Sequence, residues 1–161
     1  MLEKSIIPEC YGDTLLVKTL GFNSPNHKHG IGEVNNTMKK YYENKTAIGI
    51  IDNDKKAGPS DFKKFEVIAQ NGTLILKKKP KSRHFLIVLN PALEKWIEQV
   101  GNSVEIRKPY TNDNEFRKAF KDFKVAKNVK ITNYLNAIKQ KNPAGFRQIK
   151  LWVQQIENNE L

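Results

Sequence analysis

Residues 46–54, TAIGIIDND, are the stretch of the sequence that decides the fold. The run from Thr46 to Ile51 is short, apolar and rich in β-branched residues, and Asp52 and Asp54 follow it. Such a run predicts a strand buried on both faces, as the strands of parallel sheets are. Because side chains alternate along a strand, Asp52 and Asp54 should leave it on the same side, where both can face one ion.

Short apolar runs and segments with helical periodicity alternate on both sides of this strand. The alternation indicates a βαβ series, and therefore an α/β fold with a mostly parallel sheet of four or five strands and helices on both faces. The first strand is expected at Ser5–Ile7, ending near Glu9, and the first helix is expected to open at Asp13. A second helix is expected from Gly30 to Tyr42, where apolar residues recur at helical spacings.

The second half of the chain adds a hairpin, one more strand and a run of helices. Asn71-Gly72 is a strong hairpin signal, and Pro91 suits the first turn of a helix with Asn90 as its cap. At 161 residues the chain is expected to form one domain, 1–161, with a core at about 4–100 and a helical C-terminal extension at about 101–161. Further strands are expected at 65–69, 73–76 and 84–89, and further helices at 91–100, 114–123, 131–138 and 143–156.

The composition is that of a globular protein with an excess of positive charge. The chain contains 28 Lys and Arg against 17 Asp and Glu, which gives a net charge of +11. This charge favours polyanions through Coulomb attraction and counterion release, and nucleic acid is the commonest of them. The alternative is that the lysines only keep a small protein soluble.

Cysteine content and hydropathy indicate a cellular compartment. Cys10 is the single cysteine, so no disulfide can form within the chain and a reducing environment fits best. The sequence has no signal-peptide pattern and no run of about 18 apolar residues. The protein is therefore expected in the cytoplasm, neither exported nor inserted in a membrane.

Four carboxylates are predicted to gather at one edge of the sheet. Glu9 and Asp13 follow the first strand as Asp52 and Asp54 follow the buried one, and parallel sheets bind ligands at the carboxyl ends of their strands. If the two strands are neighbours, three or four carboxylates converge. Such a cluster is unfavourable unless a cation or raised pKa values relieve it, and all-oxygen ligands suit Mg²⁺ or Mn²⁺. The predicted metal ligands are Glu9, Asp13, Asp52 and Asp54.

Two motifs resemble those of the TOPRIM family. The run SIIPECYGDTLLVKTLG, residues 5–21, is similar to the first TOPRIM motif, a hydrophobic strand that ends in Glu with a second acid where the helix begins. The run IGIIDNDKKAG, residues 48–58, is similar to the second motif, a hydrophobic strand that ends in Asp-x-Asp. The resemblance covers residues 4 to 60 well and 61 to 100 loosely. Its spacing is most similar to stand-alone and nuclease-type members, such as the overcoming-lysogenization-defect family.

The resemblance implies Mg²⁺-dependent hydrolysis or transfer at a phosphodiester of nucleic acid, in a setting such as phage defence. It implies that Glu9 is the general acid/base or a metal ligand. Asp52 and Asp54 would bind Mg²⁺, and Asp13 would support them. Metal-bound oxygens would position the phosphate, neutralise developing negative charge and lower the pKa of an attacking water.

Further site residues, and two departures, come with the same resemblance. Glu94 stands where nuclease-type members often place another acid at the start of a helix. Those members also carry a late lysine that offsets phosphate charge, and Lys130 or Lys150 could supply it. Cys10 replaces the glycine that usually follows the first Glu, and Lys56 replaces the usual third acid. With these two departures, the site could bind one metal ion tightly instead of two. It could also be a degenerate site.

Two basic segments are candidates for phosphate binding. In NHKHGIGEV, residues 26–34, glycines at a helix N-terminus could let the backbone approach a phosphate. The segment KKKPKSR, residues 77–83, could follow a phosphate backbone. The alternative for each segment is a solvated loop. The residues predicted to bind nucleic acid or phosphate are His27, His29, Gly30, Lys55, Lys77, Lys78, Lys79, Lys81 and Arg83.

Two other functions are compatible with the sequence. One is a non-catalytic module that binds nucleic acid or a protein partner and whose acids are vestigial. The other is an enzyme that acts on a small phosphate compound. Loss of Asp52 and Asp54 should abolish metal binding by a catalyst, whereas it should strengthen nucleic-acid binding by a pure binding module. The pattern is also compatible with a partner protein or a homo-oligomer.

Overall fold

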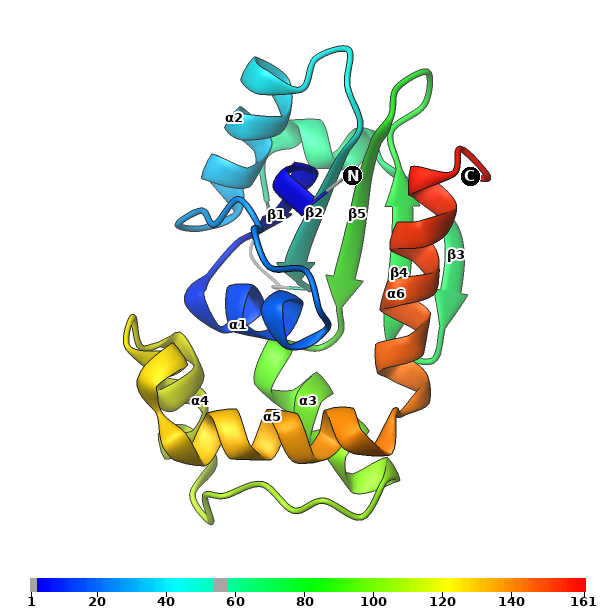
Figure 1. Ribbon diagram of the computed structural model, residues 1–161. Helices are drawn as coiled ribbons and strands as arrows, with labels where there is room; N and C mark the ends of the chain where they lie inside the picture. The colour runs from blue at the N-terminus through cyan, green and yellow to red at the C-terminus, as the bar shows by residue number, and fades with distance from the viewer. Residues whose placement is uncertain (1–2, 54–57) are drawn as a thin grey trace.

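The computed structural model describes residues 3–53 and 58–161 (Figure 1). The predictions for Asp54, Lys55 and Lys56 lie outside the described residues. In chain order the elements are η1 Glu3–Ser5, β1 Ile6–Pro8, α1 Tyr11–Thr19, α2 Ile31–Tyr41, β2 Ala47–Asp52, η2 Ser60–Lys64, β3 Glu66–Asn71, β4 Leu74–Lys78, β5 His84–Leu89, α3 Leu93–Ser103, α4 Asp113–Lys121, η3 Val125–Lys127, α5 Val129–Lys141 and α6 Ala144–Glu157.

The described strands form one mixed sheet in the order β1-β2-β5-β4-β3. β1, β2 and β5 run parallel, β4 is antiparallel to β5, and β3 is antiparallel to β4. The predicted α/β class is therefore confirmed. The hairpin lies at Asn71-Gly72, between β3 and β4. It makes one side of the sheet antiparallel, while the parallel side carries the acidic strand ends.

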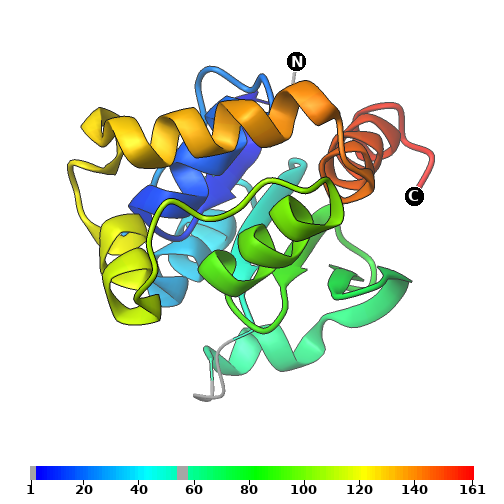
Figure 2. The same cartoon turned by 90° about the horizontal axis from the view of Figure 1, so that it is seen from below.

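Alternate residues of β2 enter two different cores, and this places helices on both faces of the sheet. Ile48 and Ile50 join the larger core, to which α1, α3, α4, α5 and α6 all contribute. Ile51 joins a smaller core with Val34 and Met38 of α2. In Figure 2, α1, α5 and α6 lie above the sheet and α2 lies below it. The continuous apolar character of TAIGII follows from burial on both sides.

The last third of the chain is helical and belongs to the larger core. α6 runs beside the β3–β4 hairpin, where the amide Nδ2 of Asn71 donates to Oε1 of Gln148 at 2.6 Å. α4 and α5 lie beside α1 (Figures 1 and 2). None of the helices within residues 3–53 and 58–161 combines the length and the apolar content that a bilayer crossing requires.

An extended segment covers the outer edge of β1. The backbone N–H groups of Asn26 and Lys28 donate to the carbonyl oxygens of Ile6 and Pro8, at 2.8 and 3.0 Å. The N–H of Gly30 then donates to the carbonyl of Glu9 at 2.7 Å. These bonds hold the loop before α2 directly beside the strand end that carries Glu9.

Two helices begin at other residues than the sequence predicts. α1 begins at Tyr11 with Cys10 as its cap, because the sulfur of Cys10 accepts from the N–H of Asp13 at 3.4 Å. Asp13 is therefore inside the first turn and not at its start. α3 begins at Leu93 instead of Pro91, with Ala92 in the cap position. Its first N–H is bound by Oδ1 of Asp52 at 2.9 Å, so a strand end replaces the predicted local cap.

Gly12 lets α1 approach the helices that follow the sheet. A Cβ at this position would lie 2.6 Å from Cδ2 of Leu93 and 2.7 Å from the carbonyl oxygen of Phe120. Both distances are too short for real contacts, and the second involves backbone that cannot simply rotate away. The absence of a side chain at Gly12 therefore sets the distance between α1, α3 and α4.

Replacing Gly12 by Ala should lower the free energy of unfolding by about 1–3 kcal/mol, the usual cost of overpacking a well-filled core. The measurement is urea unfolding followed by circular dichroism. Gly32→Ala in α2 is the matched control, because no described atom lies within 4 Å of the added Cβ. Equal effects of the two substitutions would contradict this account of Gly12.

Candidate functional site

Glu9 and Asp52 meet at the carboxyl edge of the parallel strands. β1 and β2 are neighbours with Pro8 opposite Ile50, and the N–H of Glu9 donates to the carbonyl of Ile50 at 3.1 Å. The N–H of Asp52 in turn donates to Oε2 of Glu9 at 3.2 Å. Backbone pairing and a side-chain contact together place the two acids side by side.

Asp13 lies next to these acids and is fully buried. Its Oδ2 accepts from the thiol of Cys10 at 3.1 Å. Its Oδ1 is also buried, and among the described residues it has no hydrogen-bond partner. A buried carboxylate oxygen without a partner is costly, and such groups in native proteins commonly mark a bound ion or a functional proton.

The three acids influence each other's ionisation. The pKa of Asp13 is raised well above its ordinary value by burial first, and then by the negative charges of Asp52 and Glu9. Burial and the charge of Asp13 also raise the pKa of Cys10, so this thiol stays protonated and acts as a hydrogen-bond donor. The cluster therefore gains from a proton or a cation near Asp13, as the sequence pattern predicts for converging carboxylates.

Asp52 also connects the strand to α3. Its Oδ1 accepts from the N–H of Leu93, the first residue of this helix. A helix N-terminus carries partial positive charge, and this favours the ionised form of a carboxylate placed there. The same contact fixes the orientation of Asp52 beside Glu9.

The donor chemistry of the cluster fits a hard cation, but the described acids do not complete a site. Within residues 3–53 and 58–161, no group of three or more His, Cys, Asp or Glu is arranged to hold a metal ion. Glu9, Asp13 and Asp52 offer oxygen only, and Mg²⁺ keeps several of its water ligands in most protein sites. A cation bound here would take its remaining ligands from water.

A cavity of about 200 Å³ opens beside Asp52. Its wall includes Lys63 of η2 and Lys77 of β4, and Gly58 and Pro59 form part of the rim. Lys77 was predicted to bind phosphate, whereas Lys63 was not recognised in the sequence. Two lysines and Asp52 therefore line one small concave surface, and lysines there suit a phosphate group.

The rest of the basic run 77–83 lies at the opposite edge of the sheet. Lys78 pairs with Phe85 near the start of β5, and its Nζ donates to the carbonyl of Leu161 at 3.2 Å. Arg83 binds Oγ1 of Thr46 at 2.6 Å and the carbonyl of Ile156 at 3.3 Å. Lys79 and Lys81 lie in the turn between β4 and β5. Of this run, only Lys77 lines the cavity beside Asp52.

The predicted histidine loop lies next to the acids. Nδ1 of His27 and Oγ1 of Thr14 are 2.6 Å apart, and the His27 ring stacks on Tyr11 with 4.6 Å between centroids. His29 meets His27 edge to face at 4.7 Å. The pKa of His27 is lowered, first by burial and then by the neighbouring His29. Gly30, with a φ of 96°, adopts the left-handed conformation that allows the chain to enter α2.

The three remaining predicted site residues, Glu94, Lys130 and Lys150, lie away from the acidic cluster. Glu94 follows Leu93 in the first turn of α3, but it lines a separate cavity of about 450 Å³ between α3 and α4. Nζ of Lys130 lies 5.3 Å from the centre of the Tyr110 ring. Lys150 is exposed on α6, the helix that runs beside the hairpin. The structure places Glu94 one residue from an Asp52 contact, whereas no described contact links either lysine to the acids.

Replacing Asp13 by Asn should raise the free energy of unfolding at neutral pH, because it removes a carboxyl group whose ionisation burial and Asp52 disfavour in the folded state. The folded-state pKa of Asp13 lies above its ordinary value of 3.8. The wild type should therefore lose stability as pH rises from about 4 towards that raised pKa, and the variant should not. Urea unfolding over a series of pH values measures the difference. A variant that is less stable than wild type at pH 7 would contradict this prediction.

Asp61 provides a control, because its pKa is shifted in the opposite direction from that of Asp13. It accepts from Nζ of Lys39 at 3.0 Å and from Nδ2 of Asn35 at 3.2 Å, and these bonds lower its pKa to about 2. The contribution of Asp61 to the free energy of unfolding should be complete above pH 3.8, the ordinary pKa of an aspartate. This contribution should be lost as the pH falls towards about 2. Asp61→Asn should therefore reduce stability at neutral pH, under the conditions in which Asp13→Asn increases it.

Comparisons with protein-family models, curated proteins and solved structures found no match to this chain. The basis for a functional proposal is therefore the geometry of Glu9, Asp13 and Asp52 together with the two sequence motifs in which they occur.

Proposed function

We propose that this protein is a TOPRIM-type domain that hydrolyses or transfers a phosphodiester of nucleic acid with the help of Mg²⁺ or Mn²⁺. The observation that carries the proposal is the hydrogen bond from the N–H of Asp52 to Oε2 of Glu9, across adjacent parallel strands. The acids of the two TOPRIM-like motifs thereby share one strand edge. The buried, unpartnered oxygen of Asp13 beside them is a second supporting observation.

Each residue has a separate task in this proposal. A bound divalent cation would neutralise negative charge on the phosphate and lower the pKa of a water molecule. Asp52, held by the N–H of Leu93, presents an oriented carboxylate, and Glu9 beside it accepts or returns the proton of the reacting group. Lys63 and Lys77, at the wall of the neighbouring cavity, hold phosphate oxygens of the substrate.

The excess of positive charge supports nucleic acid as the substrate, because a net charge of +11 attracts a polyanion to a site that is itself acidic. A reducing cytoplasm is the proposed location, since Cys10 is the single cysteine of the chain. In the described structure this thiol donates to Asp13. A disulfide sulfur at position 10 would have no hydrogen to donate to Asp13.

A non-catalytic nucleic-acid-binding module is the second candidate function. It is favoured by the incomplete ligand set among the described residues and by Cys10 in place of the glycine of the family motif. In such a module the acids would only repel the phosphate backbone. Their removal would then strengthen binding of nucleic acid, in contrast to its effect on a metal-dependent enzyme.

Divalent-metal binding separates the two functions. Calorimetric titration of Mg²⁺ or Mn²⁺ should show binding by the wild type, and Asp52→Asn should weaken it by about 10-fold or more, an effect that even indirect ligand partners commonly reach. Asn keeps an oxygen that can accept from Leu93, so the start of α3 is preserved. Asp113→Asn, at an exposed position of α4, is the control that should leave metal binding unchanged.

Cleavage assays in the same buffer complete the test. Single- and double-stranded substrates should be cut only when the metal is present, and the Asp52→Asn, Asp54→Asn double variant should cut neither. If the wild type binds no divalent ion even with nucleic acid present, the enzymatic proposal fails. Stronger nucleic-acid binding by the double variant would then support the binding module.

A further inference from the structure

Phe123 is an exposed aromatic side chain in a protein that buries its other phenylalanines. It exposes 66% of its surface, whereas the other seven phenylalanines are buried or half-buried. It follows α4, which ends at Lys121, and precedes η3. A single exposed ring is common on protein surfaces, and what distinguishes Phe123 is its position beside other aromatic rings and a lysine.

Phe123 continues into a row of rings that reaches the carboxylates. Its ring lies edge to face with Tyr11, with 6.5 Å between centroids. Tyr11 stacks on His27, and His29 meets both of them at their edges. Tyr11, His27, His29 and Phe123 are named here the aromatic surface. It begins two residues after Glu9, and the N–H of Gly30, beside His29, donates to the carbonyl of Glu9.

The chain segment around Phe123 carries an excess of positive charge. Residues 113–130 contain six Lys and Arg against three acids, and one of these acids, Asp113, already pairs with Lys108. Nζ of Lys124 lies 5.4 Å from the centre of the Phe123 ring. This composition suits an anionic ligand with a flat apolar part, and it does not suit an apolar protein surface.

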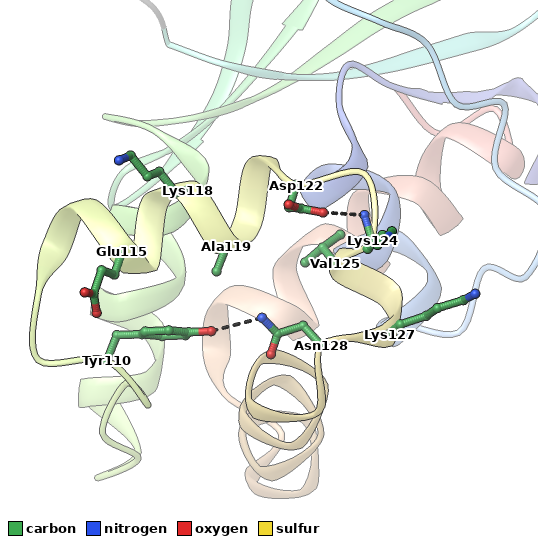
Figure 3. A pocket seen from close by; sticks show the side chains of 9 residues that line it. All are labelled: Tyr110, Glu115, Lys118, Ala119, Asp122, Lys124, Val125, Lys127 and Asn128. Atoms are coloured by element: carbon green, nitrogen blue, oxygen red, sulfur yellow. Dashed lines mark hydrogen bonds between the residues drawn. The ribbon is translucent and has the colours of Figure 1, made fainter.

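A cavity of about 550 Å³ lies between the end of α4 and the start of α5 (Figure 3). Asp122 and Lys124, the two chain neighbours of Phe123, both line it. Lys118 and Lys127 lie on opposite sides of the cavity in Figure 3. Its floor includes Tyr110, whose hydroxyl accepts from Nδ2 of Asn128 at 2.9 Å. The volume is within the usual range for sites that hold small organic ligands.

We propose that the aromatic surface binds single-stranded nucleic acid, with an unpaired base stacked on Phe123 and the adjacent phosphates held by Lys118, Lys124 and Lys127. The bound strand then continues past Tyr11 towards Glu9 and Asp52. Stacking selects unpaired bases, because the faces of bases in a duplex are already covered by their neighbours. This inference deepens the proposed function and rests on it for the choice of nucleic acid.

Fluorescence anisotropy with a labelled oligothymidylate of about 12 nucleotides tests the inference in the presence of EDTA. Phe123→Ala should weaken binding of the single strand by about 5- to 150-fold, the usual effect of removing one stacked aromatic side chain. Its effect on a duplex of the same length should be much smaller. Phe123→Tyr should bind the single strand as the wild type does. The control is Leu151→Ala, because Leu151 is 46% exposed but lies on α6.

A tryptophan at position 123 reports contact directly. The native Trp96 and Trp152 expose only 2% and 4% of their surfaces, so Phe123→Trp adds a single exposed indole. Its emission should be quenched when the oligothymidylate binds. Quenching by the single strand but not by the duplex would support a stacked, unpaired base.

Three results would overturn the inference. They are no binding of the single strand by the wild type at low salt, unchanged binding by Phe123→Ala, and equal losses for single strand and duplex. Unchanged binding would assign the exposed ring to another partner, such as a protein. The metal titration needs no nucleic acid and this assay needs no metal, so failure of one is distinguishable from failure of the other.

Discussion

The arrangement of the site depends on Asp52, which connects three elements at one strand end. Its N–H donates to the carboxylate of Glu9 after β1, and its own carboxylate accepts from the first N–H of α3. β2 therefore cannot shift against β1 without breaking the first contact, nor can α3 move without breaking the second. The position of α3 in turn requires Gly12, because only a residue without a side chain lets α1 approach Leu93 and the backbone of Phe120. Packing and the acidic cluster are thus parts of one arrangement.

The cluster places opposing demands on stability and ionisation. Burial and two neighbouring negative charges disfavour the ionised form of Asp13. The thiol of Cys10 compensates one oxygen, while the other remains buried without a partner among the described residues. Natural proteins keep such unfavourable groups at functional sites and offset their cost with well-packed structure elsewhere. The two apolar cores on either side of β2 supply that packing here.

Local sequence signals predicted the elements well and the contacts between distant residues poorly. The strand 84–89 has the predicted bounds, because an apolar run that ends at Asn-Pro is unambiguous. The predicted start of α3 was wrong, because the carboxylate that binds its first N–H belongs to Asp52, several elements earlier in the chain. Lys77 and Lys78 look alike in sequence, yet alternation along β4 puts them on opposite faces, and only Lys77 lines the cavity beside Asp52. Phe123 was predicted as the last residue of a helix that in fact ends at Lys121, so its exposure had no sequence signal.

The two edges of the sheet differ in a way that limits self-association. Hydrogen bonds from residues 26–30 cover the β1 edge, whereas no described strand lies beyond β3, whose Val67 and Ile68 are 57% and 43% exposed. A register shift between Val67 and Ala69 makes the β3 edge irregular, which is a common protection against strand addition. With only one edge available, pairing of sheets from two molecules would use up both free edges and stop at a dimer. Edge-to-edge pairing of sheets alone therefore cannot build a fibril from natively folded molecules.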